Sequence, residues 1–147
     1  PTCTPIQDAV PLFRLNQASV TDHFYTASAA EADNAVNVLG FVREGTTGLV
    51  FQNQVPGTVP VHRLYNSTTL DHAYTTAANP STIPGYDVYG IDGYIYAQGI
   101  CGAVPWFRLH NSVVGDHIYT TSVVERDNAA QAGYVFEGIE GYILPSD

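Results

Sequence analysis

The sequence contains no lysine and few charged residues of any kind. Charged side chains make up 13% of its 147 residues, and five arginines stand against fourteen acidic residues, which gives a formal net charge of −9. A charge of this sign repels phosphate backbones and anionic lipids, so we expect no nucleic-acid or membrane-surface partner. No apolar run reaches the length that spans a bilayer, so membrane insertion is not expected either.

Cysteine is also scarce, since Cys3 and Cys101 are the only two. We expect them to form one disulfide that ties the N-terminal tail to a point late in the chain. Asn66 begins an Asn-Ser-Thr acceptor sequence for N-glycosylation in a secreted chain. No signal peptide is present, so Pro1 would be a mature terminus after processing. Together these features favour a secreted protein.

Three copies of one sequence pattern fill the chain. Each copy begins with Val-Pro and contains an Arg-Leu pair, and eight residues after the arginine comes Asp-His-x-Tyr-Thr. The pattern predicts a single domain, 1–147, composed of repeats 10–57, 58–102 and 103–145, which we call units 1, 2 and 3. Units this short cannot each bury both of their faces, so they must share a core.

Local signals predict the same elements in each unit. Two short strands around a polar turn predict a hairpin, with Asp-His-x-Tyr-Thr on its second strand. In units 1 and 3 the capping boxes Ser28 to Glu31 and Ser122 to Glu125 predict a helix that ends at a glycine. Unit 2 has Pro80 in this region, so we expect a short irregular connection. A Gly-x-x-Gly motif before the last strand predicts positive φ or close backbone approach.

These elements predict a mainly β fold with short helices. We expect three β-β-(α)-β-β repeats in a closed pseudo-threefold arrangement, because closure protects strand edges. A three-bladed propeller-like ring is favoured over a β-trefoil-like arrangement, because the helix within the unit does not suit a plain trefoil. On the second strand, period-2 geometry places His23 and Tyr25 on one face and Phe24 on the other, and we expect the Phe24 face to point into the core.

With its motifs in this order, the chain resembles a secreted repeat family of fungi and bacteria. The units of that family read Val-Pro-Leu-Tyr-Arg-Leu-Tyr-Asn, then Asp-His-Phe-Tyr-Thr-Thr, then Glu-Gly-Ile-x-Gly-Tyr, and the resemblance covers residues 8–144. The family is known as a repeat of unknown function. The resemblance implies a secreted protein of a mushroom-type fungus, and the family's association with secreted hydrolases suggests glycan binding. Unit 2 departs from the pattern at Ala73 and at Tyr89, where the other units have Glu44 and Glu137.

The polar and aromatic residues that recur in all three units are the candidate binding residues. A sugar site needs an aromatic face for C–H groups and planar polar side chains for hydroxyls, and each unit offers both. Three weak sites would gain strength by avidity on a repeated glycan. We therefore predict a lectin-like carbohydrate-binding protein with no cofactor and no metal. The predicted ligand-binding residues are Arg14, Asp22, His23, Tyr25, Arg63, Asp71, His72, Tyr74, Arg108, Asp116, His117 and Tyr119.

Roles other than sugar binding also remain possible for these residues. Each aspartate could end its hairpin turn through hydrogen bonds with the backbone, and each arginine could form an ion pair with that aspartate or with Glu44 or Glu137. His23, His72 and His117 could also gather around the pseudo-threefold axis as a metal site, although no close-spaced ligand pair supports one.

Two other functions also stay open. A secreted glycan hydrolase could use Glu44 or Glu137 as an acid near a histidine, but a catalytic pair repeated three times would be unusual. A structural or protein-binding module, such as an inhibitor, would instead use the variable turns. We favour a non-enzymatic protein, and the sequence does not decide its oligomeric state.

Overall fold

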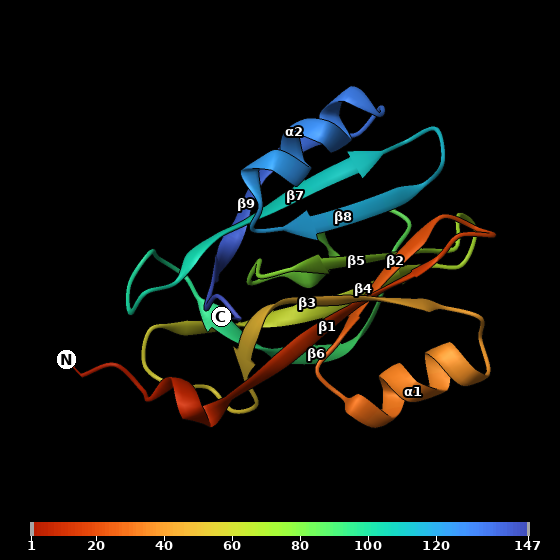
Figure 1. The fold of residues 1–147 in the computed structure, drawn as a ribbon. Coiled ribbons are helices and arrows are strands. Elements are labelled where there is room, and N and C mark those ends of the chain that lie inside the picture. Colours follow the sequence, from red (N-terminus) through yellow and green to blue (C-terminus); the bar gives the residue numbers. More distant parts are fainter. Residues whose placement is uncertain (1, 147) are drawn as a thin grey trace.

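The fold is mainly β, as predicted. A computed structural model describes residues 2–146, and Pro1, the expected processed terminus, lies outside them. The described chain forms nine strands and two short α-helices (Figure 1). The strands are β1 (Ala9–Gln17), β2 (Asp22–Thr26), β3 (Val42–Phe51), β4 (Thr58–Asn66), β5 (Asp71–Thr75), β6 (Asp87–Tyr96), β7 (Val104–Asn111), β8 (Asp116–Thr120) and β9 (Val135–Ile143). The helices are α1 (Ala29–Asn37) and α2 (Val123–Gln131), and two 3-10 helices occupy Ile6–Asp8 and Pro80–Thr82.

Each unit contributes three antiparallel strands. In unit 1 the middle strand β1 pairs with β2 on one side and with β3 on the other. In the same way β4 pairs with β5 and β6, and β7 pairs with β8 and β9. The predicted hairpin, with Asp-His-x-Tyr-Thr on its second strand, is therefore confirmed in all three units. The arginine–tyrosine pairs that face each other across the hairpins are Arg14 and Tyr25, Arg63 and Tyr74, and Arg108 and Tyr119.

Backbone pairing between units is sparse. One residue pair joins β3 to β6 and another joins β6 to β9, which makes a nine-stranded antiparallel sheet. The sheet is not closed, since its path ends at β2 and β8 and only an isolated bridge links Leu49 to Leu144 within the described chain. The closed arrangement expected from the sequence is therefore not made by strand pairing. Side chains, described below, add hydrogen bonds and ion pairs between units.

The two helices flank the strands from opposite sides of the molecule (Figure 1). The Ser28 hydroxyl accepts a hydrogen bond from Glu31 N at 3.1 Å, and the Ser122 hydroxyl accepts one from Glu125 N at 3.0 Å. The predicted helices and their N-caps are thus confirmed, and a glycine with positive φ follows each helix. The second bond of each capping box comes from a threonine instead of the glutamate, because the hydroxyls of Thr26 and Thr120 accept the N–H groups of Ser28 and Ser122 at 3.1 and 3.0 Å. In unit 2 the short irregular connection is confirmed, with the 3-10 helix Pro80–Thr82 in place of a helix.

The central core lies where β2, β5 and β8 meet. Tyr25, Tyr74 and Tyr119 pack edge to face there, with ring centroids between 5.3 and 5.6 Å apart. Phe24 instead packs in a separate cluster beneath α1. The Phe24 face of the strand is buried in the core, as expected, but it packs in this separate cluster rather than against the central tyrosines. Both faces of β2 are buried, and the tyrosine face is the central one because its hydroxyls find backbone partners there.

The second glycine of each Gly-x-x-Gly motif lets one unit approach the next closely, as predicted. A Cβ at these positions would come within 3 Å of a side chain from another unit, which real Cβ atoms do not tolerate. Any side chain there would push the units apart. The distance from such a Cβ to the nearest side-chain atom would be 2.8 Å at Gly48 (Ile143), 2.7 Å at Gly93 (Val50) and 2.6 Å at Gly141 (Ile95).

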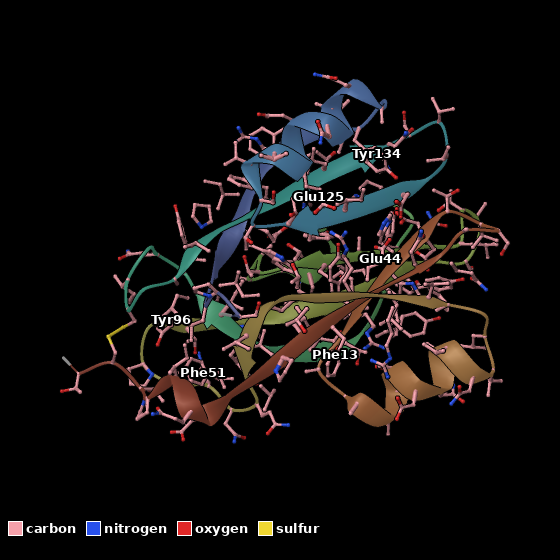
Figure 2. The ribbon with its side chains drawn as sticks, viewed as in Figure 1. Phe13, Glu44, Phe51, Tyr96, Glu125 and Tyr134 are labelled. Atoms are coloured by element: carbon pink, nitrogen blue, oxygen red, sulfur yellow. A yellow bond between two sulfur atoms is a disulfide. The ribbon has the colours of Figure 1, made fainter. Side chains whose placement is uncertain are left out.

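The predicted disulfide is confirmed. Cys3 and Cys101 are bonded, with their Cα atoms 5.8 Å apart, and Figure 2 shows the bond at the same end of the molecule as Phe51 and Tyr96. Cys101 packs against the core cluster that these two aromatic residues form. The bond therefore fastens the N-terminal segment to the chain just before unit 3. No helix of the described chain is long and apolar enough to cross a membrane.

Candidate functional site

The Asp-His pairs meet between units rather than within one hairpin. In each pair the histidine Nδ1 lies against the aspartate of a neighbouring unit, and the same carboxylate accepts the backbone N–H of that histidine. The three units therefore hold one another in a cycle, which we call the Asp-His ring. Its pairs, with the Nδ1–Oδ2 distances, are His23 with Asp116 (2.6 Å), His72 with Asp22 (2.7 Å) and His117 with Asp71 (2.6 Å).

The aspartates of the ring are buried, and two of them gain a third donor. The hydroxyl of Tyr86 donates to Asp71, and the hydroxyl of Tyr134 donates to Asp116 at 2.6 Å. Unit 1 has Phe41 at the corresponding position, so its aspartate has no tyrosine donor of this kind. A ligand could contact these carboxylates only if the Asp-His ring opened. The main role of the ring is therefore to join the three units.

Aspartates, not histidines, converge at the centre of the ring. One carboxylate oxygen from each of Asp22, Asp71 and Asp116 lies within 4.8 Å of the other two. A second group of possible metal ligands joins Asp71 to His110 and His117, and among residues 2–146 the three histidines of the ring form no such group. Each of the three carboxylates already accepts two hydrogen bonds from a histidine, which accounts for its burial.

The predicted binding tyrosines form a second cycle. The hydroxyl of Tyr25 donates to the carbonyl of Tyr119 at 2.9 Å and accepts the N–H of the same residue at 2.8 Å. Tyr74 makes the same pair of bonds with Tyr25, and Tyr119 makes it with Tyr74. All three side chains are 0% exposed, so they present no atom to a ligand in this arrangement.

The predicted binding arginines lie at the boundaries between units. Arg14 binds Glu125 of unit 3 through both Nη atoms, each at 2.7 Å, and binds Glu44 of its own unit through Nε at 3.0 Å (Figure 2 labels both glutamates). Arg63 binds Glu31 of unit 1 in the same two-bonded way, at 2.9 and 2.6 Å. Glu31 and Glu125 are the capping-box glutamates, and their hydrogen bonds with the arginines lower their pKa values. They stay ionised, and each links its helix to the neighbouring unit.

The boundary between units 2 and 3 is built differently. Pro80 stands where the other units have the capping-box glutamate, so unit 2 offers no equivalent partner to Arg108. Arg108 instead binds two glutamates of its own unit, Glu137 at 3.0 Å and Glu140 at 2.9 Å. Glu140 in turn accepts the backbone N–H of Thr76 in unit 2 at 3.0 Å. Glu140 of unit 3 thus takes the place of a capping-box glutamate from unit 2, and Arg108 is linked to unit 2 through it.

A cavity lies beside each arginine cluster. The cavity between units 1 and 3 has a volume of about 220 Å³ and is bordered by Arg14, Thr46 and Thr121. The cavity between units 1 and 2 has a volume of about 390 Å³ and is bordered by residues that include Asp92, a second partner of Arg63. The cavity beside the arginine of unit 3 has a volume of only about 90 Å³. Carboxylates border all three cavities, so each offers acceptors for hydroxyl groups.

His23 has the clearest electrostatic signature in the Asp-His ring. Burial by itself lowers the pKa of His23, but hydrogen bonds with Asp116 and Glu44 outweigh burial and raise this pKa to about 9. The second of these partners lies 3.3 Å from Nε2. The imidazole is therefore protonated at neutral pH and balances the charge of its buried partner.

We expect the protein to lose stability as the pH rises from about 6.5 through about 9. The pKa of His23 is higher in the folded chain than in the unfolded chain, so its protonation stabilises the fold fully below the unfolded value and less as the pH passes the folded value. The loss should be on the order of 3 kcal/mol. Urea unfolding near both ends of this range would measure it, with His23→Gln as the comparison. An equal pH dependence in the two proteins would contradict the assignment.

The glycosylation acceptor Asn66 takes part in its own hairpin turn. Its Oδ1 accepts the backbone N–H groups of Thr68 and Thr69 at 2.9 and 3.1 Å, and its Nδ2 packs against Gly85. Asn111 serves the turn of unit 3 in the same way. In the turns of units 2 and 3 the side-chain bonds thus come from asparagine rather than from the aspartate. Glycosylation of Asn66 stays a prediction.

Glu44 and Glu137 lie where the hydrolase interpretation needs them, but their environment opposes that role. Glu44 is 3.3 Å from His23 Nε2, and Glu137 is 3.7 Å from His117 Nε2. Each also pairs with the arginine of its own unit, as the structural interpretation of the arginines predicted. The hydrogen bond with His23 lowers the pKa of Glu44, whereas a general acid requires a raised pKa.

Sequence reasoning missed four carboxylates that bind the arginines. Glu31 and Glu125 were assigned to capping boxes, which would have satisfied them locally. Asp92 and Glu140 occupy one position of the Gly-x-x-Gly motif, where unit 1 has Thr47. The composition contained a signal for these carboxylates. The chain has fourteen acidic residues and five arginines, so each arginine can find more than one acidic partner.

These features define a mainly β protein in which buried side-chain cycles join three similar units. The chain belongs to the family described as a domain of unknown function (DUF5648), whose model matches residues 11–144. This agrees with the resemblance to a family of unknown function. No curated protein and no solved structure matches the chain.

Proposed function

We propose that this protein is a secreted, lectin-like carbohydrate-binding module with up to three sites, one at each boundary between units. The observation that carries the proposal is the cavity beside each arginine cluster. Each cluster holds guanidinium donors and carboxylate acceptors in fixed positions, and sugar hydroxyls need both kinds of partner. Sites on several faces of one small body suit a ligand with repeated sugars, such as a cell-wall glycan.

In this proposal the buried residues act through the arginines. Tyr25 faces Arg14 across the hairpin, and the Asp-His ring sets how far each unit stands from the next. We also propose that the three units form a pseudo-threefold, propeller-like body rather than a β-trefoil-like one. Two features support this arrangement: β2, β5 and β8 all meet at the centre, and the tyrosine and Asp-His contacts are both cyclic.

The alternatives are weaker on physical grounds. A hydrolase would need a raised carboxyl pKa, and the pKa of Glu44 is lowered. A protein-binding module would use the hairpin turns, where Val113 and Val114 are 92% and 43% exposed in unit 3 and Leu70 is 40% exposed in unit 2. One or two exposed apolar residues in a turn are common on protein surfaces and do not by themselves define an interface.

A glycan array that includes fungal and bacterial cell-wall polysaccharides tests the proposal. We expect selective binding that survives chelation, since no metal takes part. The double variant Thr46→Val/Thr121→Val removes hydroxyls from the cavity between units 1 and 3 and keeps its charges, and it should weaken binding by roughly fivefold, as the loss of about one net hydrogen bond would. Thr4→Val, outside the cavities, is the matched control and should have no effect. If the wild-type protein binds none of the glycans, the proposal fails for these sugars.

A further inference from the structure

Five rings form a continuous row across the boundary between units 1 and 2. Phe41 lies against Phe24 with ring centroids 5.7 Å apart, and Phe24 lies against His72 at 4.8 Å. The row continues from His72 to Tyr65 at 4.5 Å and from Tyr65 to Tyr89 at 5.9 Å. We call these five residues the aromatic row. It brings together side chains from β2, the chain just before β3, and the three strands of unit 2.

The row begins in the interior and ends in solvent. Phe24 and Phe41 are buried under α1, His72 and Tyr65 are half-buried, and Tyr89 is 62% exposed. A large ring at the surface that rests against a half-buried ring loses little conformational freedom when a ligand covers it, which favours binding. Tyr65 supports Tyr89 in this way, through an edge-to-face contact in which the two ring planes are 83° apart.

The aromatic row is specific to this boundary. At the corresponding places in units 1 and 3, glutamate replaces Tyr89, and asparagine or histidine replaces Tyr65. The glutamates there lie near the histidine Nε2 atoms, whereas no carboxylate among residues 2–146 is within ion-pair distance of His72 Nε2. The substitution at position 89 thus adds a ring and also leaves a histidine nitrogen without an acidic partner.

A cavity of about 190 Å³ opens beside the buried part of the row. The rings of Phe24, Phe41 and His72 border it, and polar side chains come from Glu31, Asn34 and Arg63. The same boundary therefore combines an exposed ring, an imidazole, a carboxylate and a carboxamide. Aromatic faces receive the C–H groups of a sugar ring, and planar polar groups receive its hydroxyls.

We propose that the aromatic row and this cavity form the principal sugar site of the protein, with one site per chain, and that the ligand is a neutral pyranose. The inference rests on the proposed carbohydrate-binding function and ranks its sites: a single sugar measurably occupies only this one, and the weaker boundary cavities contribute by avidity on a repeated glycan. Tyr89 and Tyr65 receive the apolar face of the sugar, and His72 Nε2 and Asn34 receive its hydroxyls. The sugar is neutral because the net charge of −9 repels an anionic one, and the one guanidinium at the cavity, that of Arg63, is already paired with Glu31 and Asp92.

Calorimetric titration with single sugars tests the inference. The probes are the methyl glycosides of galactose, glucose, mannose and N-acetylglucosamine, with glucuronic acid as the anionic comparison. We expect one site per chain for at least one neutral glycoside and weaker binding of glucuronic acid. Tyr89→Ala and Tyr65→Asn should each weaken binding about tenfold or more, because each removes an aromatic face. Phe136→Ala, which removes a ring that is 45% exposed on β9 outside the row, should stay within about twofold of wild type.

The outcomes separate this inference from the broader proposal. If a glycoside binds but both tyrosine variants bind as tightly as wild type, or three sites per chain are found, the aromatic row is not the principal site and the carbohydrate function stands. If the wild-type protein binds neither these sugars nor any glycan on the array, both proposals fail. Equal binding of glucuronic acid would overturn the argument for a neutral ligand. The urea unfolding midpoint of each variant, compared with that of the wild type, shows whether the variant is still folded.

Discussion

Replacement of Asp116 by asparagine is expected to lower the free energy of unfolding by about 3–5 kcal/mol. Asp116 is 0% exposed and accepts hydrogen bonds from the imidazole and backbone of His23 and from the hydroxyl of Tyr134. Asparagine keeps the shape but removes the charge, which leaves the buried imidazolium of His23 without its carboxylate at Nδ1 and with only the more exposed Glu44 near Nε2. Urea unfolding at neutral pH would measure the change.

Two comparisons make this prediction sharper. Asp33→Asn is the exposed control, because Asp33 pairs with Arg43 on the surface and should cost no more than about 0.5 kcal/mol. Asp22→Asn should cost less than Asp116→Asn, because burial raises the pKa of Asp22 and its unit has phenylalanine where the others have the tyrosine donor. Equal stability of Asp116→Asn and wild type would show that the Asp-His ring does not join the units energetically.

Removal of the disulfide is the second change with a large expected effect. The double variant Cys3→Ser/Cys101→Ser opens a loop in which the cysteines are 98 residues apart. In the chain-entropy model a bond that closes such a loop stabilises the fold by about 4–5 kcal/mol, because it restricts the unfolded chain. We expect the variant to unfold at a correspondingly lower urea concentration and to keep its native fold at low denaturant.

A reductant supplies the control for the disulfide. Dithiothreitol should lower the stability of the wild-type protein to that of the double variant and should leave the variant unchanged. Because the bond holds only the N-terminal segment and the chain before unit 3, the Asp-His ring should survive its loss. A change below about 1 kcal/mol would contradict the chain-entropy account and would indicate strain in the native bond or structure in the unfolded chain.

The three units keep their interior alike and let their surfaces differ. The tyrosine cycle and the Asp-His ring use the same residue types in every unit, whereas Pro80 and Tyr89 change one boundary each. This division is physically reasonable, because a cycle of buried hydrogen bonds fails if one member is lost. An exposed position such as 89 can change without that cost, so it is a place where a specific site can arise.

Much of the architecture was determined by the sequence alone, because it depends on local interactions. The hairpins follow from apolar and turn residues a few positions apart, and the helices follow from Ser28 and Ser122 as N-caps. The irregular connection of unit 2 follows from its prolines, and the close approach at Gly48 follows from its motif. The disulfide was also predictable, because the chain has only two cysteines.

Only the tertiary structure decided which copy each side chain meets. The three units read alike, so the sequence could not say whether His23 binds the aspartate of its own hairpin or, as it does, Asp116 of unit 3. For the same reason Glu31 was assigned to its own cap, although Arg63 of the next unit offers it a stronger, two-bonded partner. Local patterns determine elements, but the choice among equivalent partners depends on how closely the units pack. That distance is set by contacts such as Gly48 against Ile143, which lie far apart in the chain.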